Sequence, residues 1–301
     1  MIFALIKSLR PKQWTKNLLV FAGYLFTLDQ TRPPGTLITV LSAFGLMCAV
    51  SGVVYIFNDA LDAEKDRNHP LKSKRPIASG AVSVRAAVTF AIILLLVSVF
   101  LSFYLDPFFG VLVLAYLALT SAYSARLKHI VIIDLLAIAV GFVIRAVAGA
   151  VVITVINPET GAASRAQISP WLILCTTLLA LFLGLAKRRA ELMSLENGGT
   201  NHRKILGEYS APMLDQMLNI SASVALMAYF LYTFTWGSRT GTSHPYIMAT
   251  IPFVICGIFR YLFLIHTTNA GATPEQLLLE DKPMLINLIL WAVAAVIAMR
   301  V

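Results

Sequence analysis

The most polar segment of the chain reads NDALDAEKDRNHP, from residue 58 to residue 70, and it follows directly on an apolar run. If this segment continues as a helix, each residue turns by about 100°, and one amide and three carboxylates share a face. Like charges crowded in this way repel one another, and carboxylate oxygens suit Mg²⁺. The alternative is a solvated charged loop that alternates acidic and basic residues. The candidate metal ligands are Asn58, Asp59, Asp62 and Asp66.

Basic residues follow the acidic segment within a few positions. They are Lys72, Lys74, Arg75 and Arg85. Carboxylates for a metal beside cations for phosphate form the layout expected for a magnesium-bound diphosphate ester. This neighbourhood favours a binding site over a solvated loop.

The composition indicates an integral membrane protein made of helices. The 301 residues are 58% hydrophobic and only 13% charged, and the mean hydropathy is +0.78. Such values are typical of chains with several apolar segments long enough to cross a bilayer. Nine apolar spans are predicted, near residues 14–31, 36–58, 87–105, 107–125, 130–155, 168–187, 213–236, 245–265 and 284–301.

The distribution of basic residues predicts the orientation. A net charge of +9 could suit nucleic acid, but the charges are not spread as a nucleic-acid surface requires. With the N-terminus inside, 18 of the 24 Lys and Arg residues fall in inner segments and four in outer ones. This asymmetry follows the positive-inside rule. We therefore expect a multi-pass protein of the inner (cytoplasmic) membrane, with the C-terminus outside and no nucleic-acid partner.

Two charged residues fall in the fifth predicted span. Arg145 lies at mid-span, where a charge costs about 2.5–3.5 kcal/mol even on the gentler insertion scale. It is expected to face a cavity, a partner on another helix or an anionic ligand; the alternative is a purely structural ion pair. Asp134 lies eleven residues earlier, about 16 Å along a helix axis, so the two cannot pair directly.

Two further basic stretches each have two possible roles. Lys16 follows Trp14 at the entry to the first span, where both fit interfacial anchoring or contact with a lipid phosphate. Lys187-Arg188-Arg189-Ala190-Glu191 ends the sixth span, and it suits either a positive-inside stop signal or phosphate binding. The three cysteines fall in apolar spans and are interpreted as small core residues.

Two motifs resemble the first signature of the UbiA superfamily of intramembrane prenyltransferases. They are Asn58-Asp59-x-x-Asp62-x-x-x-Asp66-Arg67 and Arg75-Pro76-x-x-Ser79-Gly80. The resemblance spans almost the whole chain. It implies a single transmembrane domain over residues 1–301, with nine transmembrane helices around a central cavity.

One departure from that family pattern distinguishes between two classes of substrate. Members that use a lipid diphosphate carry a second acidic motif, Asp-x-x-x-Asp, after the sixth helix, whereas this chain has the basic stretch that begins at Lys187. The replacement argues against a second metal site. A phosphoribosyl-transferring branch of the superfamily is similar at this stretch and at others, namely residues 10–17, 69–78, 127–129, 144–149 and 187–192.

That resemblance implies magnesium-dependent transfer of 5-phosphoribose from phosphoribosyl pyrophosphate to a polyprenyl (decaprenyl-type) phosphate, with release of pyrophosphate. The active site is expected on the cytoplasmic face. Alternatives are a prenyltransferase that joins a polyprenyl diphosphate to an aromatic or other small acceptor, and a non-enzymatic lipid-phosphate binder. Homo-oligomerisation is left open.

The implied roles divide the candidate residues into three groups. Asp59, Asp62 and Asp66 hold Mg²⁺ on the donor pyrophosphate, with Asn58 orienting it. Tyr123, Lys128 and Asp134 line the mouth of the site, where Asp134 stabilises positive charge at the anomeric carbon. The other residues assigned to substrate binding are Lys16, Lys72, Arg75, Arg145, Lys187, Arg188 and Glu191.

Overall fold

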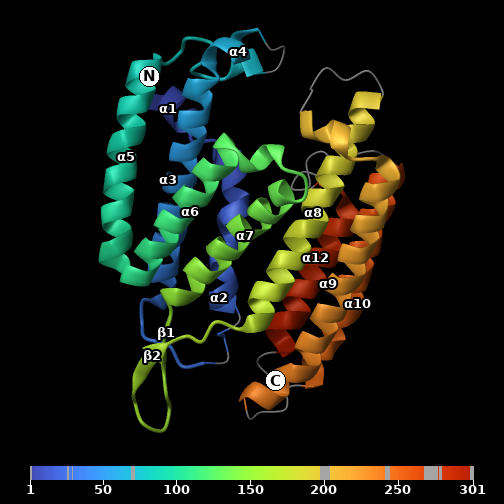
Figure 1. Cartoon of the computed structure of the whole chain (residues 1–301). Helices are drawn as coiled ribbons and strands as arrows, with labels where there is room; N and C mark the ends of the chain where they lie inside the picture. Colours follow the sequence, from blue (N-terminus) through green and yellow to red (C-terminus); the bar gives the residue numbers. More distant parts are fainter. Residues whose placement is uncertain are drawn as a thin grey trace. The chain divides into compact units, whose positions relative to one another are not determined.

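The structure is a computed structural model of the chain, and it describes residues 2–25, 27–28, 30–68, 72–196, 204–240, 245–267, 277 and 280–298. Nearly all of its elements are helices (Figure 1). The α-helices are α1 Ile2–Ser8, α2 Ala22–Leu25, α3 Thr36–Leu61, α4 Ala63–Arg67, α5 Val84–Leu105, α6 Pro107–Ala125, α7 Ile133–Val151, α8 Pro170–Glu196, α9 Ala211–Thr240, α10 Ile251–Thr267 and α12 Lys282–Ala298. The 3₁₀ helices are η1 Pro11–Phe21, η2 Lys72–Lys74, η3 Leu127–His129, η4 Lys204–Glu208 and η5 Pro245–Thr250, and the strands are β1 Thr154–Ile156 and β2 Ala163–Arg165.

Seven helices of the described residues are long and apolar enough to cross a membrane. The seven segments are Thr36–Leu61, Val84–Leu105, Pro107–Ala125, Ile133–Val151, Pro170–Met193, Ala211–Thr235 and Tyr246–Thr267. Large apolar side chains remain exposed along them, as Phe100 and Ile220 do. Apolar surface of this kind is stable against lipid but not against water. The prediction of an all-helical, multi-pass membrane protein is confirmed.

The two ends of the predicted nine-span pattern differ from the structure. The span predicted near residues 14–31 is not one α-helix, because η1 and then the short α2 occupy its place. The backbone of this segment packs directly on α7: a Cβ built on Gly149 would lie 1.8 Å from the carbonyl oxygen of Val20. The last predicted span corresponds to α12, whose 17 residues are about one turn shorter than the usual spanning length.

The chain folds into two compact units, and the first comprises residues 1–126 and 144–168. Within it α3 packs against α5 and η1, and α5 packs against α6 (Figure 1). Asp106 separates α5 from α6, and its carboxylate caps α6 by accepting from the backbone N–H groups of Phe108 and Phe109. Two apolar clusters hold the unit together, one around Val40, Met47 and Phe109 and one around Val53 and Ile56.

A short hairpin closes the first unit after α7. Strands β1 and β2 pair antiparallel, with Thr154 opposite Arg165, and the intervening turn uses Gly161 at a φ of 68°. The hairpin is attached to the rest of the unit by the Arg165–Asp106 ion pair, 2.6 Å long, and by the Ile156 N–H, which donates to the Thr31 carbonyl.

The second unit comprises residues 127–143 and 169–301. Helices α8 and α9 pack along each other, and α10 packs against α12. Its core includes Phe182, Leu214, Leu218 and Tyr261, and the rings of Phe182 and Tyr261 lie 5.3 Å apart. Helix α7 belongs to both units, because its residues up to 143 pack in the second and the remainder in the first.

Candidate functional site

The acidic segment breaks its helix at Asp62. Helix α3 ends at Leu61, Asp62 has φ −94° and ψ 4°, and α4 begins at Ala63. As a result Asp59 and Asp66 are buried, Asn58 is half-buried and Asp62 is exposed. The sequence predicted that one amide and three carboxylates share a face of a continuous helix. The helix is not continuous, and Asp62 is exposed whereas the other two carboxylates are buried.

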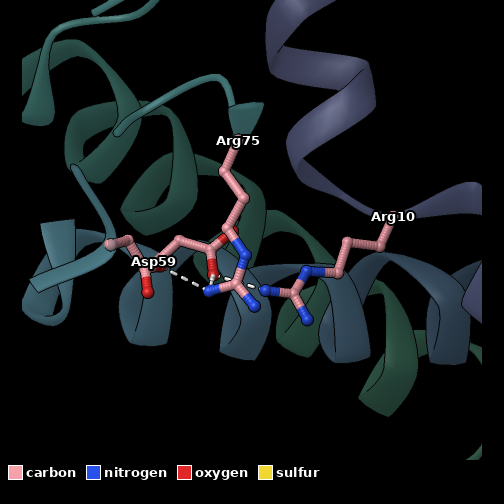
Figure 2. A network of polar contacts seen from close by, with 4 residues as sticks. Arg10, Asp59 and Arg75 are labelled. Atoms are coloured by element: carbon pink, nitrogen blue, oxygen red, sulfur yellow. Dashed lines mark hydrogen bonds and ion pairs between the residues drawn. The ribbon is translucent and has the colours of Figure 1, made fainter. Parts of the chain in front are cut away.

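Arg10 and Arg75 contact the buried Asp59 (Figure 2), and Arg75 also contacts the buried Asp66. Arg75 Nη1 donates to Asp59 Oδ1 at 3.0 Å and to Asp66 Oδ2 at 2.5 Å. Arg10 Nη2 forms an ion pair with the same Asp59 Oδ1. The sequence predicted Arg75 at the site but missed Arg10, although Arg10 opens the basic motif of residues 10–17. The two arginines place positive charge beside these carboxylates and offset part of the cost of burying them.

The backbone of Arg10 is strained where it enters this cluster. Its φ of 52° and ψ of 65° fall in the left-handed region, which non-glycine residues seldom adopt. The guanidinium carbon also lies 4.9 Å from the ring centroid of Tyr55, within cation–π range. Backbone strain of this kind persists only where surrounding contacts impose it, and it concentrates at functional sites.

The two buried aspartates fit a magnesium ion better than the predicted set of four ligands does. Asp59 and Asp66 converge on one nitrogen of Arg75, so a cation already sits between them. The contacts use Oδ1 of Asp59 and Oδ2 of Asp66, and each carboxylate has a second oxygen for a metal. Mg²⁺ is usually bound through one or two carboxylates together with substrate phosphates. Among the described residues no group of three or more His, Cys, Asp or Glu could hold a metal.

A second polar cluster lies in the second unit, around Asp134 at the start of α7. Arg188 Nε donates to Asp134 Oδ2 at 2.8 Å, and Arg188 Nη1 donates to Glu191 Oε2 at 2.7 Å. Asp134 is fully buried and the Arg188 side chain is only 2% exposed. The structure thus brings together three residues that the sequence predicted at the site.

Tyr209 completes this cluster, although no motif in the sequence pointed to it. Its hydroxyl donates to Asp134 Oδ1 at 3.0 Å and accepts the Ile132 N–H at 2.8 Å. Ile132 has a φ of 68°, which a β-branched residue rarely adopts. Burial raises the pKa of the Tyr209 hydroxyl, so Tyr209 stays protonated and donates to the carboxylate at neutral pH. Both oxygens of Asp134 are therefore bound by partners.

The basic stretch after the sixth span is largely engaged in ion pairs. Besides the Arg188 contacts, Arg189 Nε pairs with Asp215, and Arg189 Nη1 donates to the Ile265 carbonyl at 3.2 Å. Lys187 is half-buried. Binding of substrate phosphate by this stretch stays a prediction, and for Arg188 it would require an exchange of partners.

Arg145 is buried within the first unit and contacts neutral partners on other elements. Its Nε donates to Asn17 Oδ1 and its Nη2 to the Tyr116 hydroxyl, both at 2.8 Å. Asn17 in turn donates to Ser51 Oγ at 3.1 Å. These bonds join η1, α3, α6 and α7, so Arg145 links elements of the fold in the way that the partner-on-another-helix alternative described.

The remaining predicted residues are half-buried and occupy separate short elements. Lys16 lies in η1, Lys72 in η2, Tyr123 near the end of α6 and Lys128 in η3. His69 and Pro70, which belong to the family-like stretch of residues 69–78, lie outside the described residues.

Comparison with known sequences finds one matching family model and relatives that share one name. A sequence model described as "UbiA prenyltransferase family" matches residues 17–289. A protein of Corynebacterium glutamicum named decaprenyl-phosphate phosphoribosyltransferase is 33% identical over 99% of this chain and 87% of its own length. A Mycobacterium tuberculosis protein of the same name is 31% identical over 97% of this chain and 92% of its own.

Comparison with solved structures supports the fold. A UbiA homolog from Archaeoglobus fulgidus bound to GPP and Mg²⁺ matches with a TM-score of 0.68 and 18% identity, over 99% of this chain and all of the other. A digeranylgeranylglyceryl phosphate synthase structure matches with the same TM-score and 17% identity over 100% of this chain and 99% of its own. The family model covers most of the chain, and the relatives exceed 30% identity over nearly its full length. This chain is a membrane-embedded transferase that belongs to the UbiA prenyltransferase family.

Proposed function

We propose that the protein transfers 5-phosphoribose from phosphoribosyl pyrophosphate to a polyprenyl phosphate and releases pyrophosphate. The observation that carries the proposal is near-full-length similarity, at 31–33% identity, to proteins named decaprenyl-phosphate phosphoribosyltransferase. The basic stretch that begins at Lys187 agrees with this proposal, because it replaces the second acidic motif expected in family members that use a lipid diphosphate. In the reaction the bond from the anomeric carbon to pyrophosphate breaks, and a bond to a lipid phosphate oxygen forms.

Asp59 and Asp66 are the residues that would hold magnesium. When bound, the metal withdraws electron density from the pyrophosphate leaving group. The role of the chain here is to keep two carboxylates fixed on one point, which the burial of Asp59 and Asp66 and their contacts with Arg75 achieve. Asn58 and Asp62 complete the predicted set from less buried positions. The acceptor phosphate is already an anion, so the transfer needs no strong base.

The other roles assigned from the sequence are retained in this proposal. Arg75 and Lys72 neutralise donor phosphates, and Asp134 stabilises positive charge as it develops at the anomeric carbon. We further propose one domain over residues 1–301 with nine membrane helices around a central cavity. The N-terminus lies in the cytoplasm, and the active site faces the same side of the inner membrane.

The test is a transfer assay with purified protein in detergent. Radiolabelled phosphoribosyl pyrophosphate, a long-chain polyprenyl phosphate and Mg²⁺ should give label in the organic phase, and EDTA should abolish it. At a limiting Mg²⁺ concentration, Asp66→Asn should strongly lower the yield of this product. Glu64→Gln is the matched control, because Glu64 is exposed on the same short helix, α4. A folded, purified protein that yields no labelled lipid would contradict the proposal.

A second candidate function is prenyl transfer from a lipid diphosphate to an aromatic or other small acceptor. It is favoured by the similar fold of the Archaeoglobus homolog, whose structure contains GPP and Mg²⁺. The lipid is the acceptor in the first function and the donor in the second. Incubation with a prenyl diphosphate and an aromatic acceptor, in the absence of phosphoribosyl pyrophosphate, gives product only under this second function.

A further inference from the structure

A basic cavity adjoins the buried aspartates of the first unit. Its volume is about 250 Å³, and its lining includes Lys7, Arg10, Lys74 and Arg75 together with Asp59. Ligand pockets usually hold about 300–1,000 Å³, so this cavity suits one end of a substrate better than a whole one. Lys7 and Arg10 were not predicted from the sequence to bind substrate, and Lys74 was named only among the basic residues that follow the acidic segment.

The charge balance of this cavity favours an anion with more than one negative charge. Arg10 and Arg75 pair with Asp59, and Arg75 also pairs with Asp66, so two cations are balanced by two carboxylates. Lys7 and Lys74 add two further positive charges from exposed positions. A phosphate monoester carries about −1.5 to −2 charges near pH 7, which matches this excess.

The two arginines retain donors that can reach such a ligand. A guanidinium carries five N–H donors in a fixed fork. The contacts with the aspartates use Nη2 of Arg10 and Nη1 of Arg75, and the two side chains remain 29% and 28% exposed. The aspartates therefore orient both guanidinium groups, and each keeps further N–H donors at the cavity that both arginines line. Arg10 has a left-handed backbone conformation, which is strained for a residue other than glycine and accompanies the position of its side chain at the cavity.

We infer that this cavity is a subsite for a phosphate monoester, and that its ligand is the 5-phosphate of the phosphoribosyl donor. The assignment to the donor rests on the proposed function. The cavity shares Asp59 and Arg75 with the proposed magnesium site. The donor carries its pyrophosphate and its 5-phosphate on the same small sugar. When the pyrophosphate lies at the aspartates, the 5-phosphate therefore lies next to Lys7 and Lys74. The lipid phosphate is also a monoester, so the experiment must separate the two sources.

The first measurement is calorimetric binding of ribose 5-phosphate, with ribose as the uncharged comparison. Lys7→Gln and Lys74→Gln should each weaken ribose 5-phosphate binding about tenfold, because each removes a charge-assisted contact. Lys65→Gln is the matched control, since Lys65 is exposed on α4 and does not line the cavity. Lys74→Arg should restore most of the affinity. Absence of binding to the wild-type protein, or equal affinity in all variants, would overturn the inference.

The second measurement identifies the source of the phosphate. In the transfer assay, Lys7→Gln and Lys74→Gln should raise the KM for phosphoribosyl pyrophosphate about tenfold and leave the KM for polyprenyl phosphate unchanged. A rise only in the lipid KM would overturn the assignment to the donor and place the acceptor in the cavity. The calorimetric result does not depend on turnover, so failure of the proposed function is distinguishable from failure of this subsite.

Discussion

Arg188 donates through Nε to Asp134 Oδ2 at 2.8 Å, and neither side chain is more than 2% exposed. A buried ion pair costs desolvation of both groups, and removal of one partner leaves the other charged and unsatisfied. The pair therefore couples the start of α7 to α8 within the second unit. It also joins a residue predicted to act at the anomeric carbon to one predicted to bind phosphate.

Removal of one member of this pair should destabilise the protein strongly. We expect Asp134→Leu to lower the free energy of unfolding by about 3–5 kcal/mol, because Arg188 loses its fully buried partner and keeps the half-buried Glu191. The double variant Asp134→Leu/Arg188→Met should recover much of that loss, since no buried charge is left. Thermal unfolding in detergent measures both, with Glu159→Gln in the exposed hairpin turn as control. A folded double variant with full transfer activity would refute the catalytic role of Asp134.

Tyr209→Phe tests the hydroxyl that orients Asp134. The variant keeps the ring but removes a donor to Asp134 and the acceptor of the Ile132 N–H. We expect a loss of about 1–3 kcal/mol in stability, because buried polar groups are left without a partner. The matched control is Tyr246→Phe, whose hydroxyl belongs to an exposed side chain of the same unit. Equal unfolding temperatures in the two variants would show that the Tyr209 contacts contribute little.

Gly149→Ala tests the close approach of η1 to α7. An added Cβ would lie 1.8 Å from the Val20 carbonyl oxygen, and a backbone atom cannot rotate away as a side chain can. We expect a loss of about 1–3 kcal/mol or more from the overlap. Gly45→Ala in α3 is the control, because nothing lies within 4 Å of its added Cβ. That substitution should be neutral or slightly stabilising in an unfolding experiment, since Ala is a better helix former than Gly.

Asp62, which precedes α4, and Asp66, which lies within it, should differ in their effect on magnesium. Asp66 is buried and shares Arg75 with Asp59, whereas Asp62 is exposed. In the transfer assay, Asp66→Asn should raise the Mg²⁺ concentration for half-maximal activity about tenfold or more. Asp62→Asn should raise it by less. A larger shift for Asp62→Asn would mean that the carboxylates rearrange when metal and substrate bind.

Acid should weaken the junction between α10 and α12. Arg260 donates to both oxygens of Asp281, and these bonds lower the pKa of the Asp281 carboxyl below its ordinary value. The carboxylate therefore stabilises the folded state above its unfolded pKa of about 3.9, and the contribution is lost as pH falls through the lower folded pKa. The difference in unfolding temperature between wild type and Asp281→Asn should be constant from pH 7 to about pH 5 and shrink below about pH 4. A difference that grows on acidification would contradict the sign of this shift.

Much of the membrane architecture could be predicted because hydropathy is a local property. The predicted spans near residues 36–58, 87–105 and 107–125 lie within helices whose apolar side chains face outward. The first motif also pointed to the family, because its acids and Arg75 are close in the chain. The broken helix at Asp62 and the 3₁₀ segment η1 were not predictable in this way, because packing against other elements overrides the local helical preference.

The length of the apolar segments and the spacing of the motifs are properties of neighbouring residues, so they identify this chain as a helical membrane protein of a recognisable family. Which charged residues meet depends on the tertiary structure. Arg10 and Asp59 are 49 positions apart, and Asp134 and Tyr209 are 75 apart. No spacing rule relates such residues. They meet because burial of a charged or polar group is stable only beside a complementary partner, and the fold alone supplies that partner.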